Sequence, residues 1–273
     1  MKISVITVCF NEEKNIARTI RSVLRQDTAD YEYIICDGLS TDKTVEIAAT
    51  FKSAFEQKGV EYKINSQKDG GIYFGMNNGI DMAAGDYVIF MNAGDCFHGK
   101  SAISTIIKEL EKETELPDVV YGDVVYVDRG YYEIRKAKEL SAMCEGMPFC
   151  HQSAFVTTNL IKREKFDTSF RICADFDMMS KFYRQGKKFK HIETIVSDFY
   201  AGGISSTQIL KTVRESFIVR ERYGFDYDKK AIEKQMRKGE FFTKVKYKLP
   251  MFLWKYWCVN KKHRSPESEL GNI

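Results

Sequence analysis

The sequence has few of the residues that break or crosslink a chain. It contains 4 prolines among 273 residues, and its 7 cysteines form no C-x-x-C pair and no zinc-ligand spacing. We therefore expect reduced, buried thiols, and a small disulfide-linked scaffold is excluded. With 44% hydrophobic and 29% charged residues, the composition also excludes a disordered or collagen-like chain.

Long hydrophobic runs are missing as well. Residues 3–10 form one of the longest, and this run is far shorter than the roughly 20 residues of a membrane-spanning helix. Glu12 and Glu13 follow it, without the small residues of a signal-peptide cleavage site. We therefore expect no membrane span, no secretory signal and a cytoplasmic protein.

Positive charge exceeds negative charge only slightly over the whole chain, but strongly in one segment. The net charge of +4 is too small to indicate nucleic acid or another general polyanion as the partner. Residues 229–264, however, hold 12 Lys or Arg and only 2 acidic residues, so an acidic body carries a basic tail. At roughly 150 residues per domain, the length fits one large domain plus an appendage. We expect a domain at residues 1–225, with halves at 1–128 and 129–225, and an appendage at 226–273.

Strand and helix patterns alternate along the first half of the chain. The apolar, β-branched run at residues 3–10 indicates a strand buried on both faces. Ile16, Ile20 and Val23 then follow at helical spacing, and Asn11 is expected to cap their helix. This alternation predicts an α/β fold with a doubly wound, mostly parallel sheet flanked by helices, followed by a helical basic tail. Expected strands cover residues 3–10, 31–36, 62–64, 86–91 and 118–127, and expected helices cover 16–26, 45–51, 72–84, 103–110, 176–183 and 209–220.

The loops after these strands carry acids instead of glycine-rich nucleotide motifs. Neither G-x-G-x-x-G nor G-x-x-x-x-G-K-[ST] follows the first strand. Asp37, Asp69 and Asp95 lie in loops expected at the sheet edge where α/β proteins bind ligands, and they would repel one another without a cation or a donor group among them. Asn92 and Asp95, on one Gly-containing turn, offer oxygens suited to Mg²⁺ or Mn²⁺. Taken alone, Asp95 would equally fit a turn-stabilising role.

Five segments occur in an order and spacing typical of one enzyme family. They are ISVITVCFNEEKNI (3–16), IICDGLSTDKT (34–44), QKDGGIYFGMNNGI (67–80), GDYVIFMNAGD (85–95) and ADFDMM (174–179). Over about residues 1–205 this series resembles the family-2 glycosyltransferases of the GT-A fold. Within that family it is most similar to bacterial enzymes of exopolysaccharide and O-antigen assembly.

The resemblance implies a nucleotide-sugar donor and assigns its contacts. Val8 and Phe10 match the loop that lines the base pocket, and Asp37 matches the acid that hydrogen-bonds the uracil edge. Asp69 matches the acid beside the donor's ribose and sugar, while Lys68 would offset phosphate charge. The ordinary alternatives are core packing for the two apolar side chains, an Asx turn for Asp37 and a solvated surface position for Lys68.

The same resemblance implies a metal site and a catalytic base. Asp95 matches the last acid of the family's metal motif, and Asn92 replaces its leading acid with a neutral oxygen donor. Asp175 matches the base that removes the acceptor hydroxyl proton in an inverting transfer, although it would also serve as a helix cap. Asp177 is the less favoured base, and Ala174 stands where the family usually has another acid.

Two further segments match the acceptor side of the family's site. His151 and Gln152 would donate hydrogen bonds to an acceptor hydroxyl or a diphosphate, unless the histidine has a structural role. Gly202 and Gly203 lie in the segment 199–205, which is either a lid that closes over the diphosphate or a plain turn.

Basic and aromatic residues are interleaved in the tail. Such a segment is attracted by an anionic membrane surface, and enzymes of the resembled type commonly extend a lipid-linked sugar there. Stacking on RNA bases or packing as a dimer arm are the alternatives. The residues concerned are Phe241, Phe242, Lys244, Lys246, Tyr247, Lys248, Phe252, Trp254, Lys255, Tyr256 and Trp257.

These observations lead to one functional hypothesis and two alternatives. The hypothesis is an inverting, Mn²⁺- or Mg²⁺-dependent glycosyltransferase that moves a sugar from a UDP-sugar to a saccharide or lipid-linked acceptor in cell-surface polysaccharide synthesis. It would lie peripherally on the inner membrane face. A sugar-nucleotide nucleotidyltransferase would normally carry a glycine-rich basic loop after its first strand, which this chain lacks. A non-catalytic, membrane-associated scaffold of the same fold is supported by Asn92 and Ala174.

Overall fold

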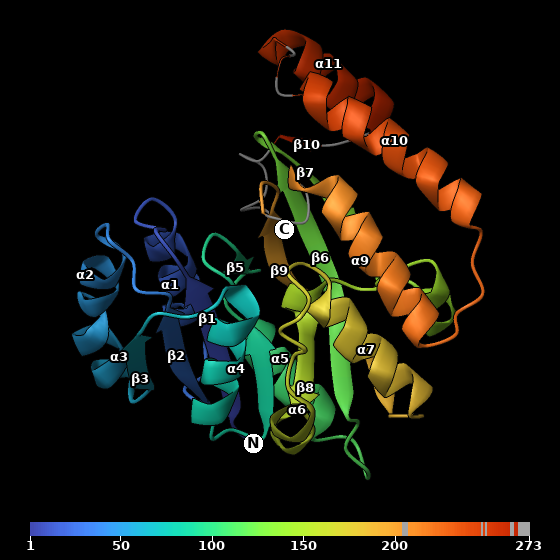
Figure 1. The fold of residues 1–273 in the computed structure, drawn as a ribbon. Helices are drawn as coiled ribbons and strands as arrows, with labels where there is room; N and C mark the ends of the chain where they lie inside the picture. The colour runs from blue at the N-terminus through green and yellow to red at the C-terminus, as the bar shows by residue number, and fades with distance from the viewer. Residues whose placement is uncertain (204–206, 247, 249, 263–264, 267–273) are drawn as a thin grey trace.

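A mixed sheet with helices on both faces forms the body of the protein (Figure 1). The computed structural model describes residues 1–203, 207–246, 248, 250–262 and 265–266. Along the sheet the strands follow the order β10-β7-β6-β8-β4-β1-β2-β3, with β9 joined to β6 and β5 joined to β9. The predicted α/β class is confirmed.

The N-terminal part of the sheet is parallel, as the alternation of strands and helices predicts. β1 (Ile3–Cys9) lies between β2 (Tyr31–Asp37) and β4 (Tyr87–Phe90), and β3 (Glu61–Ser66) pairs with β2 at the edge. Every residue of β1, β2 and β4 is buried, which explains why these segments show no polar alternation. Because the strands are parallel, the loops after β1, β2 and β4 meet at one edge of the sheet.

Helices cover each face of the sheet because alternate strand residues point to opposite sides. Ile3 and Val5 belong to one core cluster, and Ile6 and Val8 belong to the other. The first cluster is covered by α1 (Ile16–Leu24), α2 (Thr44–Ala49), α3 (Lys52–Lys58) and α5 (Ala102–Leu110), and the second by α4 (Ile72–Met82), α6 (Thr158–Glu164), α7 (Ala174–Arg184) and α9 (Ile209–Arg222).

The C-terminal part of the sheet is mixed, which the sequence does not predict. β8 (Ala154–Thr157) runs antiparallel to both β4 and β6 (Val119–Asp128), and β7 (Tyr131–Arg135) forms a hairpin with β6. β9 (Phe189–Tyr200) runs parallel to β6, and its end pairs with β5 (Cys96–Phe97). β5 spans only two residues, too few for a periodic signal, and β7 and β8 are absent from the strands that the sequence predicts. Two 3₁₀ helices, η1 (Leu140–Cys144) and η2 (His151–Ser153), connect these strands.

Asn11 links two loops and does not cap the first helix. It adopts a positive φ of 55°, and its side-chain oxygen accepts a hydrogen bond of 2.9 Å from the backbone N–H of Thr41. Asn15 occupies the N-cap position of α1, without a side-chain capping bond. The predicted cap is therefore wrong, because Asn11 joins the loop after β1 to the loop after β2.

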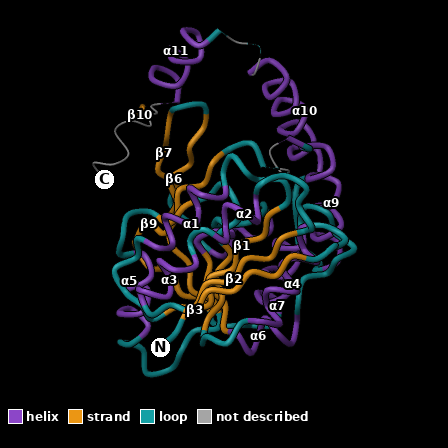
Figure 2. Tube along the Cα trace, turned by 90° about the vertical axis from the view of Figure 1, so that its left-hand side faces the viewer, coloured by secondary structure: helices purple, strands orange, loops and turns teal. Residues whose placement is uncertain are grey.

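The tail forms two helices that extend from the sheet beside the β6–β7 hairpin (Figures 1 and 2). They are α10 (Lys229–Lys246) and α11 (Met251–Lys262), and β10 (Ser265–Pro266) pairs with β7. Trp254 is only 1% exposed and packs in a cluster with Tyr131, Trp257 and Cys258. The predicted helical tail is confirmed, but Trp254 anchors it to the hairpin and does not face outward.

Some of the tail residues named in the sequence analysis lie outside the part of the chain that the structure describes. Tyr247 lies outside the described residues, and so do the side chains of Phe242, Lys244, Lys246 and Phe252. No helix within the described ranges combines the length and the apolar content that crossing a bilayer requires. Five of the seven cysteines are buried.

Candidate active site

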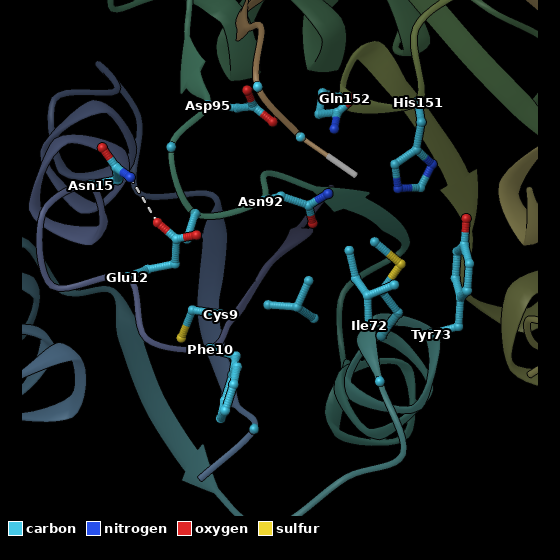
Figure 3. Close-up of a pocket in the computed structure, with 18 of the residues that line it drawn as sticks. Cys9, Phe10, Glu12, Asn15, Ile72, Tyr73, Asn92, Asp95, His151 and Gln152 are labelled. Atoms are coloured by element: carbon cyan, nitrogen blue, oxygen red, sulfur yellow. Dashed lines mark hydrogen bonds between the residues drawn. The ribbon is translucent and has the colours of Figure 1, made fainter. Parts of the chain in front are cut away.

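A cavity of about 1040 Å³ opens at the edge of the sheet where the loops after β1, β2 and β4 meet. The start of α4, the 3₁₀ helix η2, the start of α7 and the end of β9 complete its lining. Asp95, Asn92, Gln152 and His151 gather at one side of it, and Phe10 lies at the other (Figure 3). The volume lies at the upper end of the roughly 300–1,000 Å³ common for small-molecule sites.

The loops after β1 and β2 form an apolar wall at the mouth of the cavity. Val8 lines the cavity from the end of β1, and Phe10 is 59% exposed beside it. Leu39, also exposed, lines the same region with a positive φ of 65°. The Phe10 ring packs against the backbone at Gly38, where an added Cβ atom would lie 3.4 Å from it, in ordinary van der Waals contact.

Asp37 lies beside this wall but does not line the cavity. Its carboxylate accepts hydrogen bonds from the Ser40 hydroxyl, from the Ser40 backbone N–H at 2.9 Å and from the Ser66 hydroxyl at 2.6 Å. Only 2% of the residue is exposed. The carboxylate therefore organises the loop after β2, and its contact with a uracil edge stays a prediction.

Asp69 lines the cavity in front of α4. Its carboxylate accepts a hydrogen bond of 3.0 Å from the backbone N–H of Gly71. Added Cβ atoms at Gly38 and Gly75 would lie 3.3 and 3.1 Å from its Oδ2 atom, so both glycines make room for this carboxylate. Lys68, which is exposed, lines the cavity next to it.

Asp95 is the most deeply buried acid of the cavity. It is 5% exposed, and its Oδ1 atom accepts a hydrogen bond of 2.9 Å from the backbone N–H of Tyr200. Burial raises the pKa of this carboxyl to about 7, although the Tyr200 N–H, the Arg18 charge and the Gln152 amide oppose the shift. A cation next to Asp95 would restore its charged form.

Asn92 provides an unused acceptor close to Asp95. Its buried Oδ1 atom has no hydrogen-bond partner among the described residues, and both side chains line the same side of the cavity (Figure 3). Two hard oxygen donors fit a Mg²⁺ or Mn²⁺ ion that takes its other ligands from phosphates and water. Within the described residues there is no group of three His, Cys, Asp or Glu that would hold a metal by protein alone.

Asp175 lies in the first turn of α7 and lines the cavity. Its Oδ1 atom accepts hydrogen bonds from the Tyr73 hydroxyl at 3.2 Å and from the Phe176 backbone N–H at 2.8 Å. The N-cap position of α7 belongs to Cys173, so the alternative role of Asp175 as the helix cap is not observed. Asp177 does not line the cavity and forms an ion pair of 2.8 Å with Arg222, which favours Asp175 over Asp177 as the base.

His151 lines the cavity, and both nitrogens of its imidazole are buried. The ring stacks on Phe90 with centroids 5.3 Å apart, and neither ring nitrogen has a hydrogen-bond partner among the described residues. Burial lowers the pKa of His151, and the negative charge of Asp175 opposes this shift only in part. The ring is therefore neutral, with one donor and one acceptor available. Gln152 lines the cavity beside it and accepts a hydrogen bond of 3.0 Å from the Cys150 thiol.

The segment after β9 forms one wall of the cavity. Gly202 and Gly203 both line it, and Gly202 has a positive φ of 125° that favours glycine. Ile204 and Ser205, the rest of the expected lid, lie outside the described residues. The Arg18 guanidinium lies 3.6 Å from the centre of the Tyr200 ring, so α1 supports the start of this segment.

The sequence matches a known protein family over most of this fold. Residues 4–186 match the family described as glycosyl transferase family 2, and this region contains every acid that lines the cavity floor. The chain belongs to this family. It is therefore an enzyme of the glycosyltransferase class, and membership argues against both the nucleotidyltransferase and the scaffold.

Relatives and solved structures agree with this assignment. This chain is 26% identical over 224 residues to a "PGL/p-HBAD biosynthesis glycosyltransferase" of Mycobacterium bovis. The match covers 81% of this chain and 86% of the relative. Among solved structures, S. aureus TarS in complex with UDP-GlcNAc has a TM-score of 0.64 at 17% identity, covering 86% of this chain and 70% of TarS. The mannosyltransferase PcManGT from Pyrobaculum calidifontis, in complex with GDP-Man and Mn²⁺, has a TM-score of 0.63 at 15% identity, covering 89% and 69%. The predicted GT-A type of fold is confirmed.

The glycosyltransferase also has cavity residues that the sequence analysis does not single out. Glu12, Arg18, Tyr73 and Arg171 all line the cavity. Glu12 and Tyr73 lie inside two of the recognised segments, but nothing in their spacing distinguishes them from neighbouring residues. Arg18 looks like an ordinary polar position on the outer side of a helix, because its contacts with Gly94 and Tyr200 are long-range.

Proposed function

We propose that the protein is an inverting glycosyltransferase that moves a sugar from a UDP-sugar to a hydroxyl of a saccharide or lipid-linked saccharide. One observation carries this proposal. Asp69, Asp95 and Asp175, which come from three distant parts of the sequence, line one cavity of the size of a small-molecule site. Because the chain belongs to glycosyl transferase family 2, we infer that donor and acceptor meet in this cavity.

The wall formed by Phe10 and Leu39 supports the uridine end of the donor. Both apolar side chains are exposed at the cavity mouth, where they offer faces on which a base would stack. The bound UDP-GlcNAc of the structurally similar TarS supports uracil as the base, and Asp69 would then contact the ribose and the sugar. Lys68, Arg18 and Arg171 line the cavity and would offset the charge of the diphosphate.

A divalent cation fits beside this diphosphate position. The Asp95 carboxylate and the unpaired Asn92 Oδ1 atom are the residues that would hold Mn²⁺ or Mg²⁺. When bound, such an ion supplies Lewis-acid stabilisation of the departing nucleoside diphosphate. The Mn²⁺ in the similar PcManGT structure supports the assignment.

Asp175 is the proposed base of the transfer. Its carboxylate removes the proton from the acceptor hydroxyl while that oxygen attacks the anomeric carbon from the face opposite the diphosphate. The new glycosidic bond forms as the bond between the anomeric carbon and the diphosphate oxygen breaks, so the anomeric configuration inverts. His151 and Gln152 would hydrogen-bond the acceptor, and the segment containing Gly202 and Gly203 would cover the diphosphate.

The tail supports a peripheral position on the inner membrane face. Lys230, Lys234, Arg237 and Lys238 are exposed along α10, at positions that share one helix face. Phe241, Met251, Leu253 and Tyr256 are exposed apolar side chains of the same tail. Cations beside exposed apolar groups favour an anionic lipid surface, at about 1 kcal/mol per basic residue. This position suits an acceptor that is linked to lipid in cell-surface polysaccharide synthesis.

A donor screen tests the proposed reaction. We expect the protein to release UDP from at least one of UDP-glucose, UDP-galactose, UDP-N-acetylglucosamine and UDP-N-acetylgalactosamine, and to require Mn²⁺ or Mg²⁺ to do so. Its affinity for UDP should exceed its affinity for UTP, whereas a nucleotidyltransferase would prefer the triphosphate. Absence of UDP release from all four sugars together with cation-independent UDP binding would contradict the proposal.

A further inference from the structure

One carboxylate outside the cavity holds the segment that leads into the base helix. Glu215, on α9, accepts hydrogen bonds from three consecutive backbone N–H groups. Its Oε1 atom accepts from Arg171 at 3.0 Å, and its Oε2 atom accepts from Ile172 at 2.8 Å and from Cys173 at 2.9 Å. Charge-assisted bonds of this kind are about twice as strong as neutral ones, so this segment has a defined position relative to α9.

The same segment is held from its other side by α4. The Tyr73 hydroxyl contacts both the backbone carbonyl oxygen of Ile172, at 2.5 Å, and the Asp175 carboxylate, at 3.2 Å. Residue 172 is therefore fixed through its N–H by Glu215 and through its carbonyl by Tyr73. Asp175 follows three residues later and shares the Tyr73 contact.

The charges of both carboxylates, Asp175 and Glu215, act on Cys173. Burial raises the pKa of the Cys173 thiol above its usual range, and the negative charges of Asp175 and Glu215 raise it further. The Cys173 thiol also donates a hydrogen bond of 3.3 Å to the Thr212 carbonyl oxygen of α9. The start of α7 is thus attached to α9 by both backbone and side chain.

Helix α9 also connects this segment to the wall of the cavity. It begins at Ile209, a few residues after Gly202 and Gly203. Near its other end, Arg222 forms the ion pair with Asp177 of α7. A displacement of α9 would therefore change the position of the base helix as well as that of the glycine segment.

We propose that Glu215, with Tyr73 opposite it, is a positioning residue that sets the place of the Asp175 carboxylate relative to the acceptor hydroxyl. This inference rests on the proposed role of Asp175 as the base. Glu215 does not line the cavity, so its loss removes no direct contact with the nucleotide, and the Arg171 guanidinium keeps its own hydrogen bond of 2.6 Å to the Gly70 carbonyl oxygen. Proton transfer depends on distances within hydrogen-bond reach, and a shift of about 1 Å in a reacting group costs up to about 100-fold in rate.

The substitution Glu215→Gln tests this role. The amide keeps the shape of the side chain but replaces one acceptor oxygen by an NH₂ group, which faces a backbone N–H donor. For the best UDP-sugar of the four-sugar screen, we expect kcat to fall about 10- to 100-fold while KM for the donor and Kd for UDP stay unchanged. Amide hydrogen exchange in residues 171–176 should become faster.

One further variant is a control, and another is a second test of the inference. Glu221→Gln makes the same chemical change at an exposed position of α9 and should match the wild type in all four readouts. Tyr73→Phe removes the opposite contact and should also lower kcat at unchanged UDP affinity, so it tests the inference if Glu215→Gln does not fold. Wild-type kcat in a folded Glu215→Gln protein, or unchanged exchange in residues 171–176, would overturn the inference.

Asp175→Asn separates this inference from the proposed function. If Asp175→Asn loses turnover and Glu215→Gln keeps it, the base is correct and the positioning role is wrong. If Asp175→Asn keeps full turnover, the proposed base is wrong and the inference fails with it. If the wild type turns over none of the four sugars, hydrogen exchange in residues 171–176 of Glu215→Gln still decides whether Glu215 holds that segment.

Discussion

The backbone N–H of Tyr200 donates a hydrogen bond of 2.9 Å to the carboxylate of Asp95, across 105 residues of sequence. The bond joins the end of β9 to the loop after β4. Arg18 of α1 lies against the Tyr200 ring and donates a hydrogen bond to the Gly94 carbonyl oxygen. Three elements therefore fix the position of one carboxylate at the floor of the cavity.

Asp95→Asn should remove the cation dependence of diphosphate binding. The substitution keeps the size of the side chain but removes the charge that attracts a divalent ion. We expect UDP affinity in the presence of Mn²⁺ to fall about 100-fold, to the level measured without Mn²⁺, in calorimetric titrations. Asp226→Asn, at an exposed position outside the cavity, is the matched control. Full Mn²⁺ dependence in Asp95→Asn would place the ion elsewhere.

Asn92→Asp should strengthen cation binding and weaken the cation-free fold. A second carboxylate beside Asp95 adds attraction for Mn²⁺, but it adds repulsion between like charges when no ion is present. We expect tighter Mn²⁺ binding with UDP present, and a lower Tm without divalent ions, than in the wild type. Asn159→Asp, an exposed position on α6, should change neither quantity. Weaker Mn²⁺ binding in Asn92→Asp would contradict the assignment of Asn92 as a ligand.

Asp175→Asn and Asp177→Asn lie two residues apart but should affect different properties, turnover and stability. Asp175 faces the cavity, so its loss should lower kcat by about 100- to 10,000-fold and leave the Kd of UDP unchanged. Asp177 pairs with Arg222 away from the cavity, so its loss should lower stability by about 1 kcal/mol and leave turnover in place. Steady-state kinetics and urea unfolding of both variants check the contrast, and loss of turnover in Asp177→Asn alone would reverse the assignment.

Protonation of Glu32 should make the fold less stable in acid. The side chain is fully buried and accepts hydrogen bonds from the Ser4 hydroxyl, from the backbone N–H groups of Ala84 and Gly85, and from Lys63. Burial raises the pKa of Glu32, but the bonds from Ala84, Ser4 and Lys63 outweigh it and lower the pKa below the ordinary value.

A lowered folded-state pKa means that the stabilisation is present above the ordinary pKa of glutamate and is lost as the pH falls through the folded-state value. At pH 7, Glu32→Gln should therefore be less stable than the wild type by about 2 kcal/mol. Urea unfolding at a series of pH values should show this difference shrinking below about pH 4. Glu111→Gln, which is exposed, serves as the control, and a difference that grows in acid would refute the prediction.

The exposed cations of α10 should mediate membrane binding. Replacement of Lys230, Lys234, Arg237 and Lys238 by Gln should release the protein from anionic phosphatidylglycerol vesicles, because each cation contributes about 1 kcal/mol near such a surface. High salt should have the same effect on the wild type. Neutralisation of four exposed lysines of the body, Lys14, Lys52, Lys108 and Lys162, is the matched control. Equal pelleting of both variants with the vesicles would contradict a docking role of the tail.

Sequence reasoning predicts those parts of the fold that have their own local signal. The runs that form β1, β2 and β4 are mostly apolar because helices cover both faces, and this is visible in the sequence. β5 and β8 are held by pairing with strands distant in the sequence, β7 is held in a hairpin with β6, and these short segments carry no comparable pattern. The register of a mixed sheet depends on long-range contacts that local spacing does not encode.

The candidate site shows the same limit. Asp69, Asp95 and Asp175 could be predicted because each lies in a segment typical of the family, and all three line the cavity. Glu215 could not, because its role depends on α9 passing beside residues 171–173, about forty residues away in the sequence. The placement of Asp37 also depends on long-range contacts, since the Ser66 hydroxyl that binds it comes from the next strand.

A crystal structure of the protein with UDP and Mn²⁺, with the ion located by anomalous scattering, tests the central claim most directly. The account predicts an anomalous peak in contact with the Asp95 carboxylate and the Asn92 side-chain oxygen, the diphosphate on that ion, and uracil against Phe10. An ion and a diphosphate bound away from Asp95, or UDP bound at full occupancy with no anomalous peak in the cavity, would contradict it.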